Sequence, residues 1–174
     1  TSAQSQCLKD GLEFKTLTDY KELFDQKSLS KIGERLITKE TFTLDYEESV
    51  LYHGLSFSDL SKSFGRETAD RLFEKYGRAA FMPVSSMVEI IMSEGADVVI
   101  ATDSPRFEQA ALSAAKVLDV KALCIPTLFG NREIADKLFA ETKSDLYRPK
   151  YDVACVGHEK AKENILRLQN WTSN

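Results

Sequence analysis

The stretch that decides the fold is Ala96–Gly130, which reads ADVVIATDSPRFEQAALSAAKVLDVKALCIPTLFG. Val98–Ala101 is an uninterrupted apolar run, as is typical of a strand buried on both faces. Phe107–Leu118 then places small apolar residues at helical spacing, and Lys121–Ile125 returns as a second strand. A strand–helix–strand unit this compact predicts a parallel pair of strands joined by a right-handed crossover.

The loop between the first strand and the helix is the sharpest candidate for a binding site. In open α/β sheets, ligands bind outside the carboxyl ends of the strands. Arg106 could grip a carboxylate or phosphate through two parallel hydrogen bonds, and Thr102, Asp103 and Ser104 could bind sugar hydroxyls. The alternative interpretation is structural: Ser104 caps the helix, Pro105 opens it, Asp103 complements its dipole, and Arg106 faces water.

Two further loops are expected at the same edge of the sheet. Thr127, Phe129 and Gly130 follow the second strand, and Gly157 and His158 follow a third predicted strand, Asp152–Val156. Phe129 could floor a ligand cleft or simply pack under its loop. His158 could act as an acid, a base or a ligand, or could begin a helix in water. His53 stands outside any recognisable catalytic setting.

The rest of the chain supplies the covering elements. Leu12–Leu17 alternates apolar and polar residues, which predicts an edge strand. Asp25–Thr43 has few apolar anchors and predicts a loop with one short element, although a solvated helix would leave the same pattern. The apolar spacing predicts helices at these ranges: 45–54, Ser56–Phe64, Arg66–Tyr76, Val84–Ser93, Arg132–Thr142 and Glu159–Leu168.

This order predicts an α/β fold, a Rossmann-like parallel sheet sandwiched by helices, in one domain spanning residues 1–174. The net charge of −4 argues against a nucleic-acid partner. No apolar run is long enough to cross a bilayer, and the three cysteines lack metal-ligand spacing, which favours a reducing cytoplasm. The sequence contains no Walker loop, GxGxxG, GxSxG or HExxH motif, so we expect no metal site and no bound cofactor.

Four runs carry a family resemblance: DVVIATDSPR, EQAALSAAKVLDV, IPTLFG and DVACVGHEKAKENILRL. Together they resemble the N-terminal half of two-domain GT-B-type glycosyltransferases, the group that includes UDP-N-acetylglucosamine 2-epimerases. The resemblance implies one half of a two-domain chain, with the acceptor or sugar bound here and the nucleotide-sugar held by a C-terminal domain. It implies that the three loops face the cleft, and it assigns no catalytic base. The first strand and glycine-bearing loop of the family are missing, which puts the activity of this piece alone in doubt.

Two other classes stay open. A non-catalytic α/β binding or assembly module, including a homodimer, would explain the missing glycine loops and the lack of an acid–base pair. A flavodoxin-like or response-regulator-like domain is the third option, and the absence of an acidic cluster near a first strand speaks against it.

Overall fold

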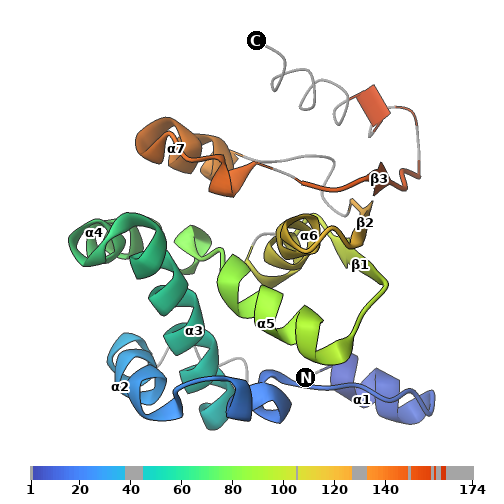
Figure 1. Cartoon of the computed structure of the whole chain (residues 1–174), viewed down its shortest axis with the longest axis horizontal. Coiled ribbons are helices and arrows are strands. Elements are labelled where there is room, and N and C mark those ends of the chain that lie inside the picture. Colours follow the sequence, from blue (N-terminus) through green and yellow to red (C-terminus); the bar gives the residue numbers. More distant parts are fainter. Residues whose placement is uncertain are drawn as a thin grey trace.

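The computed structural model describes residues 2–37, 45–104, 106–126, 133–148, 150–157, 159 and 162–163. Helices dominate the first half of the chain, and a parallel sheet forms in the second half (Figure 1). The elements are α1 (Ser2–Lys9), the 3-10 helix η1 (Leu17–Leu23), α2 (Gln26–Leu36), α3 (Tyr46–Phe64), α4 (Arg66–Tyr76), the 3-10 helix η3 (Gly77–Ala80), α5 (Val84–Glu94), β1 (Val98–Thr102), α6 (Phe107–Val117), β2 (Lys121–Ile125), α7 (Glu133–Thr142), the 3-10 helix η4 (Asp145–Tyr147) and β3 (Val153–Ala154).

The sheet confirms the central prediction from the sequence. In the described residues its order is β1-β2-β3, and both strand pairs are parallel. Ala101 lies beside Cys124, and Cys124 lies beside Ala154, so the three carboxyl ends meet at one edge. We call this edge the carboxyl edge.

The two faces of the sheet differ. On the inner face, Val99, Ala101, Ala122 and Cys124 pack against Leu112 and Ala115 of α6. The small side chains let α6 lie close to the strands. In Figure 1, α6, α5 and α3 lie successively further from the sheet on this side. The outer face exposes large apolar side chains within the described part of the chain: Val98, Ile100, Ile125 and Val153, with Leu123 half-buried between them.

Strand order explains this one-sidedness. The chain steps from β1 to β2 and from β2 to β3 in the same direction across the sheet. Right-handed crossovers that advance in one direction place both connecting helices on the same face. Accordingly α6 packs on the inner face, and Leu138 of α7 belongs to the core that lies on that side. An α/β fold with a parallel sheet is therefore present, whereas helical cover on both faces remains a prediction.

The helical layer is held together by a close approach of α2 and α3. A Cβ on Gly33 would lie 2.0 Å from the Val50 carbonyl oxygen, and one on Gly54 would lie 2.4 Å from the Leu29 carbonyl oxygen. Glycine therefore lets the two backbones touch. Of the two interpretations of Asp25–Thr43, the helix and not the favoured loop is observed over Gln26–Leu36. The predicted helix end at Gly54 was wrong, because Gly54 lies inside α3.

The start of α5 depends on a carboxylate from another helix. Its N-cap is Pro83, whose side chain makes no capping bond. Instead Asp59 of α3, buried at 2% exposure, accepts a hydrogen bond of 2.8 Å from the Ser86 backbone N–H. This satisfies one of the free N–H groups that every helix start leaves. Since α5 leads directly into β1, the bond also fixes where the sheet begins.

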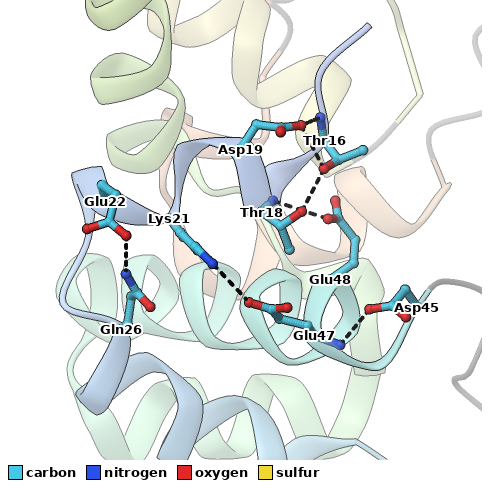
Figure 2. A network of polar contacts seen from close by, with 9 residues as sticks. All are labelled: Thr16, Thr18, Asp19, Lys21, Glu22, Gln26, Asp45, Glu47 and Glu48. Carbon is cyan, nitrogen blue, oxygen red and sulfur yellow. Dashed lines mark hydrogen bonds and ion pairs between the residues drawn. The ribbon is translucent and has the colours of Figure 1, made fainter.

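The predicted edge strand Leu12–Leu17 does not form. Residues 12–16 have no regular structure, and η1 follows at Leu17. Backbone donors at the end of this segment go to side chains instead. Glu48 of α3 accepts from the N–H group of Leu17 at 2.8 Å. It also accepts from the N–H group of Thr18 at 3.2 Å (Figure 2). Asp19 similarly accepts from the Thr16 N–H at 2.6 Å.

A polar contact docks α7 on α4. Glu141 accepts from Arg71 at 2.6 Å, from Lys75 at 2.7 Å and from the Tyr76 hydroxyl at 2.8 Å. Next to it, Leu138 is buried, whereas Ile134 is exposed. The connection from β2 to β3 is thus anchored on the helical layer, far from the sheet (Figure 1).

Candidate functional site

The candidate site lies at the carboxyl edge, at the turn from β1 into α6. Thr102 ends β1, and its hydroxyl oxygen accepts a hydrogen bond of 3.2 Å from the Ser104 N–H. Asp103 and Ser104 are half-buried beside it. Gly157 follows β3, so it leaves from the same edge. The other predicted site residues, Thr127, Phe129, Gly130 and His158, lie outside the described residues, as does Pro105.

Ser104 does not cap α6, contrary to the prediction. The helix begins at Phe107, and its N-cap is Arg106, which makes no side-chain capping bond. The Ser104 carbonyl oxygen instead accepts from the Gln109 N–H at 3.1 Å. Arg106 has φ of 79° and ψ of −120°. A left-handed conformation at a residue other than glycine costs on the order of 1 kcal/mol, and such strain is concentrated at functional sites.

An aromatic layer from the helical half closes over this turn. Tyr52 of α3 stacks on Phe107, with ring centroids 5.3 Å apart and planes 29° apart. The Tyr52 ring also meets His53 edge-on at 5.0 Å and Phe81 at 5.9 Å. Sequence reasoning missed Tyr52, because nothing in the local pattern shows that the middle of α3 reaches the start of α6.

Two guanidinium groups act on the Tyr52 hydroxyl. Burial raises the pKa of the Tyr52 hydroxyl, while the positive charges of Arg106 and Arg78 act to lower it. Glu108, one residue after Phe107, acts to raise the same pKa. Arg78 and Arg106 come from η3 and from the turn after β1, so the fold lets two cations from distant parts of the sequence act on one tyrosine hydroxyl.

His53 is a core residue, buried at 1% exposure. Its Nδ1 lies 2.8 Å from the Ser49 carbonyl oxygen, an arrangement in which the ring nitrogen donates. Burial lowers the pKa of His53, the bond to Ser49 acts to raise it, and Arg78 lowers it. The ring is therefore neutral near pH 7, with Nε2 as an acceptor that has no hydrogen-bond partner among the described residues.

These groups can bind but are not arranged as a known catalytic set. Guanidinium groups bind phosphate or carboxylate, and hydroxyl and carboxylate side chains bind sugar hydroxyls. Among the described residues, no group of histidine, cysteine, aspartate or glutamate side chains is placed to hold a metal ion. Of the three cysteines, Cys124 is buried in the predicted second strand, whereas Cys155, inside the predicted third strand, is exposed and lies after the end of β3.

A hollow lies at the opposite edge of the sheet. Its volume is about 770 Å³, and it lies between the N-terminal segment and the end of α5, lined by Leu8, Leu12, Glu13, Phe14, Lys15, Tyr20 and Glu94. Glu94 precedes β1, so this hollow faces the amino ends of the strands, away from the edge where α/β folds bind ligands.

No protein-family model matches this chain, and no match was found among curated proteins or solved structures. In the described residues, no helix combines the length and apolar character needed to cross a membrane. The assignment of function therefore depends on the geometry of the carboxyl edge and on the sequence runs that carry the family resemblance.

Proposed function

We propose that this chain is a Rossmann-like domain of a glycosyltransferase or sugar-nucleotide-processing enzyme, which binds the sugar or acceptor at the carboxyl edge. The observation that carries the proposal is the parallel sheet itself. Its strands end at one edge, and Arg106 lies there in a strained conformation beside Tyr52. A second domain would hold the nucleotide, and the chemistry would need both.

Each described group has a role in this proposal. Arg106 and Arg78 offer positive charge to a phosphate or carboxylate. Thr102, Asp103 and Ser104 offer oxygen and N–H groups to sugar hydroxyls. The Tyr52 ring supplies an apolar surface for the face of a sugar ring. The cytoplasm would supply a UDP-sugar as substrate.

Amide chemical shifts provide the test. UDP-N-acetylglucosamine and candidate acceptor glycans are titrated into the ¹⁵N-labelled full chain. We expect shifts at Thr102, Asp103, Ser104 and Arg106, and we expect Arg106→Gln to weaken binding about tenfold, as loss of a charge-assisted pair does. Lys31→Gln, on an exposed lysine of α2, is the charge-matched control and should leave the titration unchanged. Shifts that avoid the 102–106 turn, or equal affinities for the two variants, would refute the proposal.

One observation favours the alternative of a non-catalytic binding or assembly module. His53, the histidine nearest the turn in the described residues, is buried and uses Nδ1 within its own helix, so it does not reach out to a substrate. Sedimentation velocity tests this alternative. A stable dimer that shows no shifts with any UDP-sugar would support it, whereas a monomer that binds a UDP-sugar would reject it.

A further inference from the structure

The hollow at the amino ends of the strands has the features of a small-ligand site. Its volume is about 770 Å³. Sites for small molecules usually measure about 300–1,000 Å³ and are lined mostly by apolar side chains. Three large apolar side chains line this hollow and stay in water, because Leu8, Leu12 and Phe14 are 71%, 58% and 39% exposed. An apolar ligand that covered them would remove this surface from water, which is favourable.

One wall of the hollow is held by the end of α1. The Leu12 N–H donates to the Cys7 carbonyl oxygen at 2.9 Å, and the Gly11 N–H donates to the Leu8 carbonyl oxygen at 3.3 Å. With Gly11 at a φ of 65°, these two bonds form a Schellman cap, which turns the chain back after the helix. In Figure 1, α1 lies next to the end of α5, and residues of both line the hollow. The cap therefore holds Leu8 and Leu12 in one defined turn.

At the α5 end of the hollow, an ammonium group contacts a carboxylate and faces an aromatic ring. Lys15 Nζ lies 2.5 Å from Glu94 Oε1 and 5.5 Å from the centroid of the Tyr20 ring. The hydrogen bond from Lys15 lowers the pKa of Glu94, so this carboxylate is charged near pH 7. Burial raises the pKa of the Tyr20 hydroxyl, and the charge of Glu94 raises it further, so the ring is neutral. A carboxylate beside the face of a neutral aromatic ring is an arrangement that binds cations.

The charges around the hollow favour a cationic ligand. The carboxylates of Glu13 and Glu94 face a single ammonium group, that of Lys15, so the lining residues carry a net negative charge. Glu94 also ends α5, and the last turn of this fully described helix has no basic side chain. The carboxyl end of a helix carries partial negative charge, which favours a cation there. The side chains of Lys15 and Glu94 are 54% and 37% exposed, and exposed ion pairs contribute little stability, so a ligand can displace Lys15.

We propose that this hollow binds a primary amine that carries an apolar chain. The ammonium group of the ligand takes the place of Lys15 against Glu94 and Tyr20. The apolar chain lies against Leu12 and Phe14. This site is at the opposite edge of the sheet from the carboxyl edge, so the proposal does not depend on the function proposed above.

Titration of the ¹⁵N-labelled full chain with hexylamine, butylamine and hexanoate tests this preference. We expect hexylamine to shift the amide signals of Lys15, Tyr20 and Glu94. It should bind at least about tenfold more tightly than hexanoate, which meets like charge in the hollow. It should also bind about tenfold more tightly than butylamine, because two further methylene groups leave water. A hexylamine affinity that matches that of hexanoate or butylamine overturns the proposal, as do shifts that avoid the hollow.

Variants identify the groups that hold the amine. Glu94→Gln should weaken hexylamine binding about tenfold, because a charge-assisted hydrogen bond is lost. Glu74→Gln, on an exposed glutamate of α4, is the charge-matched control and should leave the affinity unchanged. Lys15→Met removes the competing ammonium group and should tighten binding about threefold, a direction that loss of folding would not produce. Equal affinities for the two glutamate variants, or binding that Lys15→Met does not tighten, overturn the proposal.

Discussion

The helical half and the sheet half of this molecule are stabilised in different ways. In the helical half, residues 17–37 and 45–95, large side chains such as Phe57, Leu60, Leu72 and Phe81 are fully buried, and α2 touches α3 backbone to backbone. In the sheet half, residues 96–126 and 150–157, the buried face is built of alanine, valine and cysteine, and the other face exposes apolar side chains within the described part of the chain. The difference teaches that the large buried side chains are concentrated in the helical half, whereas the turn of the candidate site lies in the sheet half and meets Tyr52 and Arg78 of the helical half.

The largest expected effect comes from Phe57. Its ring is completely buried, contacts Phe73 edge-on, and lies beneath the guanidinium groups of Arg35 and Arg66. Phe57→Ala should lower the free energy of unfolding by about 3–5 kcal/mol, measured by urea denaturation. Val117→Ala, on an exposed residue of the sheet half, should cost less than about 0.5 kcal/mol. Similar losses for both variants would abolish the contrast between the halves.

The next largest change in stability is expected for Gly33→Ala, and Gly157→Ala is its control. On helix propensity alone, Gly33→Ala would stabilise α2 by about 1 kcal/mol. Because the new methyl group would meet the Val50 carbonyl, we expect instead a net loss of about 2 kcal/mol.

Gly157→Ala is the matched change in the sheet half, where a Cβ meets nothing within 4 Å. It should leave the urea midpoint within experimental error. A stabilised Gly33→Ala protein would show that α2 and α3 do not pack as closely as described.

At the candidate site we expect a substitution that increases the free energy of unfolding, by less than the losses described above. Arg106→Gly removes a side chain from a left-handed position and should raise stability by up to about 1 kcal/mol. The same variant should weaken sugar-nucleotide binding, because the guanidinium group is lost. Thermal denaturation and the amide titration together check both parts. If Arg106→Gly lowered the melting temperature and left the affinity unchanged, the strained backbone at Arg106 would have no link to ligand binding.

The smallest expected change is in how the stability of the protein depends on pH through Asp152, in the sheet half. Asp152 accepts from Lys116 of α6 at 2.6 Å and from the Ala122 N–H at 2.8 Å. These bonds, the Lys116 bond above all, hold the pKa of Asp152 below its usual value near 3.8. A lowered pKa in the folded state contributes stability above the unfolded value, and this contribution is lost as the pH falls through the folded pKa.

Asp152→Asn should therefore unfold at a lower urea concentration than the wild type at pH 7. The difference should shrink below about pH 4, as the carboxylate of the wild type becomes protonated. Urea midpoints measured across this range provide the check. A difference that stays constant down to pH 3 would mean that Asp152 acts through its shape and not through its charge.

The sequence predicted the sheet better than the helical layer. The runs at Val98 and Lys121 are short, apolar and bounded by turn signals, so their pairing follows from local pattern and the crossover rule. Residues 25–43 were predicted chiefly as a loop, but α2 forms within this range. Packing against α3 stabilises this helix despite its few apolar residues. The edge strand at Leu12 failed because Glu48, 31 residues beyond Leu17, takes the place of a sheet partner.

The candidate site was predicted only in part. The 102–106 turn follows from the strand-end rule, and its position at the carboxyl edge is confirmed. Tyr52 and Arg78 could not be found, because their approach to Arg106 is set by tertiary packing across the helical layer. Serine is a preferred N-cap residue, but Ser104 does not cap α6. Arg106, in a left-handed conformation, is the N-cap, and the helix begins at Phe107.

The contact between Glu141 and α4 would make the proposed binding at the carboxyl edge sensitive to ionic strength. One carboxylate shared by Arg71, Lys75 and Tyr76 anchors the connection that leads to β3. Salt screens such a contact, since the Debye length falls to about 3 Å at 1 M. Weaker anchoring would loosen the third strand and the exit at Gly157. The affinity of the carboxyl edge for its ligand would then vary with ionic strength even if the ligand carried no charge.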